Sequence, residues 1–377
     1  MASNTIKELV SEGQSVWQDD ISRDMIQSGK LAERIEQIGI RGVTSNPTIF
    51  QKAISGSDAY DDDIKSLLGE GKSAAEIFQT IAVKDIQDAC DLFRPIYDSS
   101  NGEDGFVSIE VLAELARDTE GTIENARVLW AAVDRPNVMV KVPGTDEGAI
   151  AIETLLTEGI NINVTLLFSI ANYERVAQAY IRALKSRHAK GEPIDRLASV
   201  ASFFVSRVDT LADRKIDEVV SGGSTAGMGL EHLKGKVAVA NAQLAYEKFQ
   251  ELFASDDFKT LEAAGAQVQR PLWASTGTKN KAYSDVLYVD TLIGPHTVNT
   301  MPVATMEAFL DHGTVKRTVD ADYDAVHGVA DDMAAAGISI DDITHQLEEE
   351  GIDTFMKSYD DLLSGVEGKR AALAAAD

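Results

Sequence analysis

The chain has 377 residues, of which 44% are hydrophobic and 25% charged, so it holds enough apolar material for a large core and lacks the composition of a disordered protein. Its 61 acidic and 35 basic side chains leave a formal net charge of -26, which argues against nucleic acid and anionic membranes as partners. The N-terminus lacks a basic region followed by an apolar stretch, no apolar run reaches the length of a membrane span, and Cys90 has no second cysteine to pair with. We therefore expect a cytoplasmic protein.

Helical and β-rich segments alternate along the chain. In chain order, strands are predicted in SVWQD, GVTSNP, FVSIEV, NVMVKVP, INVTLLFS, ASVASFFVSR, PLWAS and VLYVD. Helices are predicted over residues 22–38, 74–97, 120–132, 147–157 and 172–190. Strands separated by helices are typical of a parallel sheet, and eight of them in one domain favour closure into a barrel. We expect an α/β protein in which residues 1–377 form a single (β/α)8 TIM-type barrel domain.

Two segments are additions to this repeat. Between the sixth and seventh strands, residues 209–270 contain the glycine-rich piece SGGSTAGMG and a helix predicted over 236–253. After residue 318 the sequence is acidic and predicts two or three C-terminal helices from about 319, the last over 353–375. An insertion of this kind is more often a decorated loop than a separate domain.

Alternation along the strands predicts polar side chains inside the barrel. In NVMVKVP the three valines share the face that packs on outer helices, so Lys141 points inward. The same alternation points Leu166 outward and sends inward the polar residues of three other strands: Thr44 with Asn46, Ser108 with Glu110, and Asn163 with Thr165. Because active sites of such barrels lie at the C-terminal ends of the strands, these groups form a candidate site.

Lys141 is the residue of this set with the most distinctive chemistry. Burying a lysine without a function is costly, whereas a lysine in a protected pocket can form a Schiff base with a carbonyl substrate. Alternatively, Lys141 reaches solvent at the strand end or only pairs with Glu110. The inward polar neighbours favour the Schiff base, with Glu110 as a group that activates water and relays protons. Asp19 and Asp20 end the first strand, and alternation alone does not choose which of them is a base.

Other motifs are weak. GEGKS at residues 69–73 has Ser66 where a phosphate-binding loop requires glycine. The six histidines are spaced too far apart for a local zinc motif. We therefore expect neither a nucleotide loop nor a metal site.

Six segments, taken in order, resemble the transaldolase family: GVTSNPTIF, KVPGT, NVTLLFS, SFFVSRVD, ASTGTKN and DTLIGPHTVNTMP. The chain length and the insertion look like the longer transaldolases common in actinobacteria. The resemblance implies a barrel enzyme that uses a Schiff-base lysine, Lys141 of KVPGT, to transfer a dihydroxyacetone unit between sugar phosphates in the non-oxidative pentose phosphate pathway. It implies no cofactor, phosphorylated sugars as partners, and a monomer or homodimer.

The resemblance also implies roles for individual residues. Lys141 attacks the ketone of sedoheptulose 7-phosphate or fructose 6-phosphate, Glu110 and Thr165 help water to leave, and Asp19, rather than Asp20, takes the C4 hydroxyl proton as the C3–C4 bond breaks. The enamine then reacts with glyceraldehyde 3-phosphate or erythrose 4-phosphate. The implied substrate-binding residues are Asn46, Asn163, Ser202, Phe204, Arg207, Ser275 and Lys279. Arg207 would bind phosphate, whereas Lys279 follows Ser275 at a greater distance than the arginine of many family members and offers a point charge rather than a planar fork.

Two other functions compete with this interpretation. A fructose 6-phosphate aldolase would release dihydroxyacetone to water, but those enzymes resemble shorter chains and tend to carry tyrosine where Phe204 stands. A catalytically silent barrel would serve as a binding module, and it would be expected to lack the nucleophile or the acid. The presence of Lys141, Glu110 and an aspartate favours the transferase.

Overall fold

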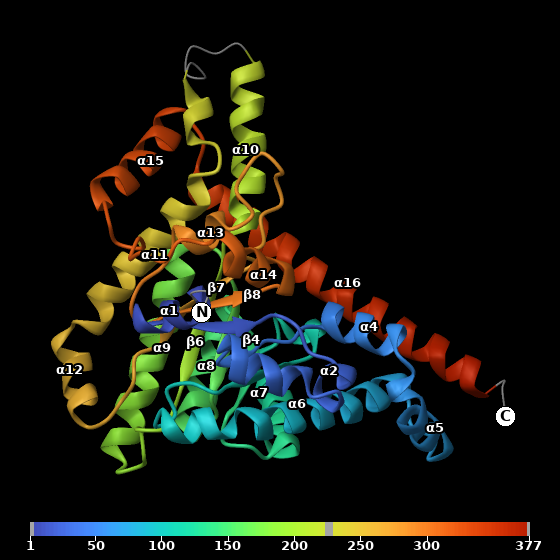
Figure 1. Cartoon of the computed structure of the whole chain (residues 1–377). Coiled ribbons are helices and arrows are strands. Elements are labelled where there is room, and N and C mark those ends of the chain that lie inside the picture. The colour runs from blue at the N-terminus through green and yellow to red at the C-terminus, as the bar shows by residue number, and fades with distance from the viewer. Residues whose placement is uncertain (1–3, 223–228, 375–377) are drawn as a thin grey trace.

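Eight parallel strands form a closed barrel in the computed structural model, which describes residues 4–222 and 229–374 (Figure 1). The strands follow one another around the barrel in chain order: β1 (Gln14–Gln18), β2 (Gly42–Val43), β3 (Val107–Glu110), β4 (Val138–Pro143), β5 (Ile162–Leu167), β6 (Ser199–Phe204), β7 (Arg270–Ala274) and β8 (Thr297–Met301). Pairing of β8 with β1 closes the barrel. The predicted (β/α)8 fold class is confirmed.

Helices surround the barrel and cover its ends. They are α1 (Thr5–Ser11), α2 (Arg23–Gln27), α3 (Lys30–Glu33), α4 (Pro47–Gly56), α5 (Asp61–Gly69), α6 (Ala74–Ser99), α7 (Thr119–Val133), α8 (Asp146–Glu158), α9 (Ile170–Ala189), α10 (Ser206–Ser221), α11 (Val237–Phe253), α12 (Asp256–Ala263), α13 (Leu287–Asp290), α14 (Val303–His312), α15 (Tyr323–Ala335) and α16 (Ile340–Ala374). Helix α16 runs along one side of the molecule and packs against α4, α6 and α10 (Figure 1).

Local capping signals decide where several of these helices begin. Ser73 and Glu76 form a reciprocal capping box at the start of α6. Asp118 and Thr145 accept hydrogen bonds from backbone amides in the first turns of α7 and α8. At α4, the side chain of Asn46 accepts a hydrogen bond from the amide of Ile49. These caps fix the point at which each chain segment leaves the barrel.

The last predicted strand and several helices differ from the sequence prediction. VLYVD is not the eighth strand: Val286, Tyr288 and Val289 are buried around the short helix α13, and β8 follows at Thr297–Met301. The sequence pattern did not predict β8 because this strand carries three polar residues although it is buried along its whole length. Thr297, Asn299 and Thr300 take part in buried hydrogen bonds through their hydroxyl or amide oxygens.

The other differences are in helices. Residues 22–38 form α2, α3 and a π-helical turn at Arg34–Ile38 rather than one helix, because Gly29 adopts a left-handed φ of 79° between them. The last helix begins at Ile340 instead of residue 353, and Gly351 within it lies close to Leu166 and Phe168. In the insertion, the helix predicted over 236–253 is confirmed as α11, while α10 and α12 were not predicted, and residues 223–228 of its glycine-rich piece lie outside the described residues.

A buried polar cluster closes the N-terminal end of the barrel. Asp104 accepts hydrogen bonds from the indole of Trp17 at 2.9 Å and from Arg41 at 2.8 Å, and it pairs with Arg270 at 3.4 Å. Above this cluster, an apolar plug fills the barrel: Trp17, Phe106, Met139, Val200, Leu272 and Val298. The open end is therefore the C-terminal one, where active sites of this fold lie.

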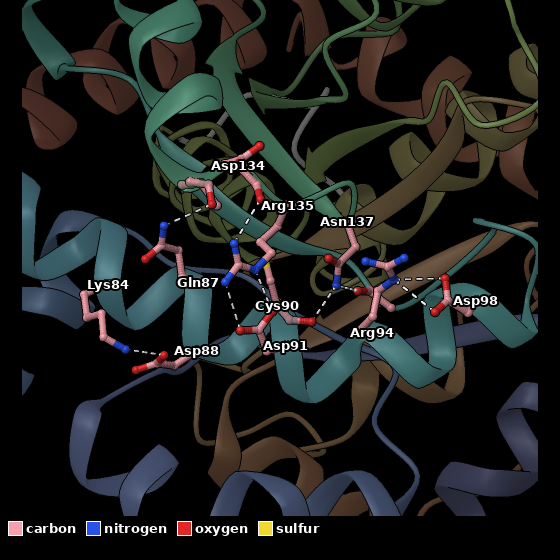
Figure 2. Close-up of polar contacts among 12 residues, drawn as sticks. Lys84, Gln87, Asp88, Cys90, Asp91, Arg94, Asp98, Asp134, Arg135 and Asn137 are labelled. Atoms are coloured by element: carbon pink, nitrogen blue, oxygen red, sulfur yellow. Dashed lines mark hydrogen bonds and ion pairs between the residues drawn. The ribbon is translucent and has the colours of Figure 1, made fainter.

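Helix α6 is attached to the segment that leads from α7 into β4 (Figure 2). Arg135 pairs with Asp91 at 2.6 Å, and the side-chain amide of Asn137 donates to the carbonyls of Cys90 and Gly105, at 2.8 Å each. Burial raises the pKa of the Cys90 thiol far above its ordinary value, which keeps the thiol protonated and unreactive. This contact region is structural, and it holds β4 in place beside β3.

Candidate active site

A cavity of about 390 Å³ opens at the C-terminal ends of the strands. Its volume lies in the range usual for small-molecule sites. Ten of the residues predicted from the sequence line it: Asp19, Asn46, Glu110, Lys141, Thr165, Ser202, Phe204, Arg207, Ser275 and Lys279. The barrel thus brings together side chains from seven different strands or the segments that follow them.

Lys141 and Glu110 form a close ion pair at the base of this cavity. They occupy paired positions on β4 and β3, and the Lys141 Nζ atom lies 2.7 Å from Oε1 of Glu110. Their side chains are only 9% and 10% exposed. Nζ also donates to the carbonyl of Ser45 at 3.1 Å. The amine is therefore held in place, within a cavity that a substrate can enter.

Burial raises the pKa of the Glu110 carboxyl, and the nearby Lys141 ammonium opposes this rise. The second oxygen of Glu110, Oε2, is buried and has no hydrogen-bond partner among the described residues. A raised pKa and an unused oxygen suit a carboxyl group that accepts and returns protons. The geometry therefore allows Glu110 to exchange a proton with Lys141 or with a water beside it.

Asp19 lines the cavity, whereas Asp20 does not. The Thr44 hydroxyl donates to Oδ1 of Asp19 at 2.7 Å and lies 2.6 Å from the hydroxyl of Thr300. Burial raises the pKa of Asp19, and Lys141 and the hydrogen bond from Thr44 oppose this rise. The structure thus places Asp19, and not Asp20, in the cavity wall.

On β5 the predicted alternation holds for Thr165 and fails for Leu166. Thr165 and Leu166 both line the cavity, although Leu166 was expected to face the outer helices. The pairing of β5 with β6 shifts between Val164 and Leu167, and Leu166 has a φ of 57°. This irregularity turns two successive side chains toward the same side, so the outward prediction for Leu166 is wrong.

Asn163 does not reach the cavity surface. It is fully buried, its amide nitrogen donates to the Ser108 hydroxyl at 2.9 Å, and its oxygen accepts from the Ser202 hydroxyl at 2.7 Å. Of these three residues, only Ser202 lines the cavity. Asn163 therefore lies behind the cavity wall and is linked to the cavity by its hydrogen bond with Ser202.

Three cations surround the cavity mouth: Lys52, Arg207 and Lys279. None of them forms an ion pair with another described residue, although most basic residues of this acidic chain do. The Arg207 guanidinium lies 5.5 Å from the ring centre of Phe204, and burial lowers its pKa. The mouth thus carries unpaired positive charge against the net charge of the chain, which suits an anionic ligand.

The family model for transaldolase/fructose-6-phosphate aldolase matches residues 16–366. The chain belongs to this family. It is 48% identical to a transaldolase of Trichodesmium erythraeum over 98% of each chain. It is also 48% identical to a transaldolase of Saccharopolyspora erythraea, over 97% of this chain and 98% of the relative, and 46% identical to one of Thermobifida fusca with the same coverage. The resemblance found in the sequence is confirmed.

Sequence reasoning missed one part of this transaldolase-family site. Lys52 and Thr48 lie one turn apart on α4, and Thr354, Phe355 and Ser358 reach the cavity from α16. The Thr48 hydroxyl donates to that of Ser358 at 3.1 Å. A signal for Lys52 was present, because the helix that begins at the end of a barrel strand can bring its first turns to the site. No local pattern could place α16 there.

Two searches of the described residues concern other classes of site. Residues 4–222 and 229–374 contain no group of three or more His, Cys, Asp and Glu side chains arranged to hold a metal ion. No helix in the same part of this family member combines the length and apolar character needed to cross a membrane.

Proposed function

We propose that this enzyme transfers a dihydroxyacetone unit from sedoheptulose 7-phosphate or fructose 6-phosphate to glyceraldehyde 3-phosphate or erythrose 4-phosphate, with Lys141 as the Schiff-base nucleophile. The observation that carries the proposal is the Lys141–Glu110 pair at the base of an open cavity. Full-length similarity to transaldolases supports the substrates and a place in the cytoplasmic, non-oxidative pentose phosphate pathway.

The first half of the reaction forms and uses the imine. The deprotonated amine of Lys141 adds to the C2 carbonyl of the ketose to give a carbinolamine. Glu110 in its acid form protonates the carbinolamine hydroxyl, which leaves as water with Thr165 beside it, and an iminium results. Asp19 then removes the proton of the C4 hydroxyl. The C3–C4 bond breaks, its electron pair moves toward the iminium to form the enamine, and the aldose phosphate departs.

The second half reverses these steps on another aldose phosphate. The enamine carbon attacks the aldehyde of the acceptor, and Asp19 returns its proton to the new alkoxide. Water activated by Glu110 then adds to the iminium, and the new ketose phosphate is released as Lys141 regains its free amine. Glu110 and Asp19 accept and return all the protons that move in these steps. Burial raises the pKa of both carboxyl groups.

Other residues bind and orient the substrate in this proposal. The oxygen of Asn46 is used to cap α4, so its NH2 group remains to donate to a sugar hydroxyl. Ser202 contacts the dihydroxyacetone unit and is held by Asn163, which acts as a positioning residue. Phe204 and Ser275 form the wall, and Arg207 and Lys279 bind the phosphate.

Borohydride trapping tests the nucleophile. The protein is incubated with fructose 6-phosphate without acceptor, reduced, digested and mapped by mass spectrometry. A three-carbon adduct on Lys141 is expected, and Lys141→Met should carry none. The matched variant Lys52→Met, which removes another lysine of the same cavity, should keep the label. A folded protein with no labelled lysine would overturn the proposal.

Acceptor dependence tests the reaction type. The family model covers transaldolases and fructose 6-phosphate aldolases together, and the apolar Phe204 provides no hydroxyl to activate a water. Turnover of fructose 6-phosphate is therefore expected to depend strongly on added erythrose 4-phosphate. Equal turnover without the acceptor, with free dihydroxyacetone as product, would show an aldolase instead.

A further inference from the structure

Lys279 lies between two cavities. It lines the active-site cavity and also a neighbouring cavity, whose lining includes Asp209 and Asp213 of α10, Tyr283 of the segment between β7 and α13, and Tyr288 of α13. Its side chain is exposed and forms no ion pair within residues 4–222 and 229–374. The direction of this side chain thus depends on how the backbone around it is held.

The segment 275–288 that carries Lys279 is tied to α10 at both ends. At its start, the amide of Ser206 donates to the carbonyl of Ser275 at 3.2 Å, and the two hydroxyls lie 2.9 Å apart. At its end, the Tyr283 hydroxyl donates to Oδ2 of Asp213 at 2.6 Å, and the Tyr288 hydroxyl donates to Oδ2 of Asp209 at 2.8 Å. Between these ties, the Thr278 hydroxyl donates to the carbonyl of Ser284 at 2.8 Å, and the amide of Tyr283 donates to the carbonyl of Asn280 at 3.1 Å.

The part of the insertion at the start of α11 holds the two aspartates of α10 from the other side. The amide of Gly235 donates to Oδ1 of Asp213 at 3.1 Å, and the amide of Ala238 donates to Oδ1 of Asp209 at 2.7 Å. Gly235 has a φ of +72°, and a Cβ atom there would lie 2.9 Å from Cζ of Tyr283. The backbone of the insertion therefore packs directly on the tyrosine ring, and each carboxylate bridges two segments.

We infer that Tyr283 and Asp213 are positioning residues for Lys279, and that through them the insertion after β6 sets the affinity for the substrate phosphate. Arg207 stands in the first turn of α10, so this helix supplies one phosphate ligand itself and aligns the second through Asp213. The inference rests on the proposed function, in which Lys279 contacts the phosphate. It assigns to the insertion a role in substrate recognition.

Tyr283→Phe is the first test, because it removes the hydroxyl and keeps the ring on Gly235. Losing one hydrogen bond to a carboxylate should raise the KM for fructose 6-phosphate and erythrose 4-phosphate by roughly 5-fold, with kcat nearly unchanged. The KM for the unphosphorylated acceptor glyceraldehyde should not change. Tyr323→Phe is the matched control, since that hydroxyl donates to Gln250 at 2.8 Å outside the cavity.

The double variant separates positioning from general loosening of the fold. In a Lys279→Met background, Tyr283→Phe should have no further effect on the KM. An undiminished further rise, or an equal rise for glyceraldehyde, would overturn the inference. Asp213→Asn is a second variant, because its amide can still bridge Gly235 and Tyr283, and it should keep the KM within about 2-fold of the wild type.

The same measurements distinguish failure of the inference from failure of the proposed function. If Lys279→Met alone leaves the KM for phosphorylated substrates unchanged, Lys279 does not bind phosphate, and that part of the proposed function fails together with the inference. If Lys279→Met raises the KM and Tyr283→Phe does not, the inference alone is overturned.

Discussion

The Nζ atom of Lys141 lies 2.7 Å from Oε1 of Glu110, at paired positions of β4 and β3. Each side chain is nearly buried, so each needs the other as a counter-ion in the free enzyme. When Lys141 becomes an iminium it remains cationic, and Glu110 can stay beside it as a partner. This relationship lets one carboxyl group serve both the resting lysine and the proton transfers.

Glu110→Gln should slow imine formation by about 10² to 10⁴-fold, the usual range for loss of a general acid–base group. The amide keeps the shape of the side chain but cannot exchange a proton. Single-turnover trapping with borohydride measures this step directly. An imine that forms at the wild-type rate would show that Glu110 is only a structural partner of Lys141.

Lys52→Met should raise the KM for fructose 6-phosphate by a factor of about 3 to 10, because it removes an unpaired charge from the mouth of the cavity. Arg207→Ala should act in the same direction and more strongly. Lys65→Met is the matched control, since Lys65 is an exposed lysine of α5 that does not line the cavity. The prediction is tested by measuring the KM of the three variants at low and at high salt. If Lys52→Met and Lys65→Met changed the KM equally, Lys52 would act only through the net charge of the protein, which would contradict the prediction.

Asp104→Ala should destabilise the fold by about 3–5 kcal/mol, because it leaves Arg270 and Arg41 without their counter-ion at the closed end of the barrel. Asp98→Ala is the control: its ion pair with Arg94 is exposed on α6 (Figure 2), and its loss should cost less than about 1 kcal/mol. Denaturant unfolding measures both values. Similar losses for the two variants would show that the cluster under the barrel does not stabilise it.

Asp209 should make the free energy of unfolding fall as the pH rises. Burial raises its pKa from 3.8 to about 6, so the folded protein binds its proton more tightly than the unfolded chain does. Its contribution is fully present below pH 3.8 and is lost as the pH rises to about 6. Asp209→Asn, which cannot titrate, should therefore lose less stability than the wild type between pH 4 and pH 7. Parallel unfolding curves for the two proteins across this range would contradict the assignment.

Much of the site could be predicted from the sequence because period-two alternation is a local property of a strand. Lys141, Glu110 and Thr165 were placed inside the barrel from alternation alone, and all three line the cavity. The order of strands and helices was sufficient for the fold class. Both results depend on neighbouring residues along the chain, which a sequence displays directly.

Other features depended on contacts between distant segments. The polar side chains of β8 disguised a buried strand because their partners, such as Gln14 and Thr276, come from other parts of the barrel. The inward turn of Leu166 depends on a shift of pairing between β5 and β6. A hydrogen-bond partner in another strand and a shift of register between strands cannot be predicted from the pattern of neighbouring residues in the sequence.

By itself, the sequence determined the alternation of strands and helices, the inward lysine and carboxylate, and the family. Only the tertiary structure decided that Asp19 rather than Asp20 reaches the cavity, that Asn163 lies beneath Ser202, and that α4 and α16 complete the wall. The physical reason is that a barrel positions side chains by closing on itself. Which groups then face one cavity depends on strand pairing and helix packing across hundreds of residues, and these are properties of the folded chain.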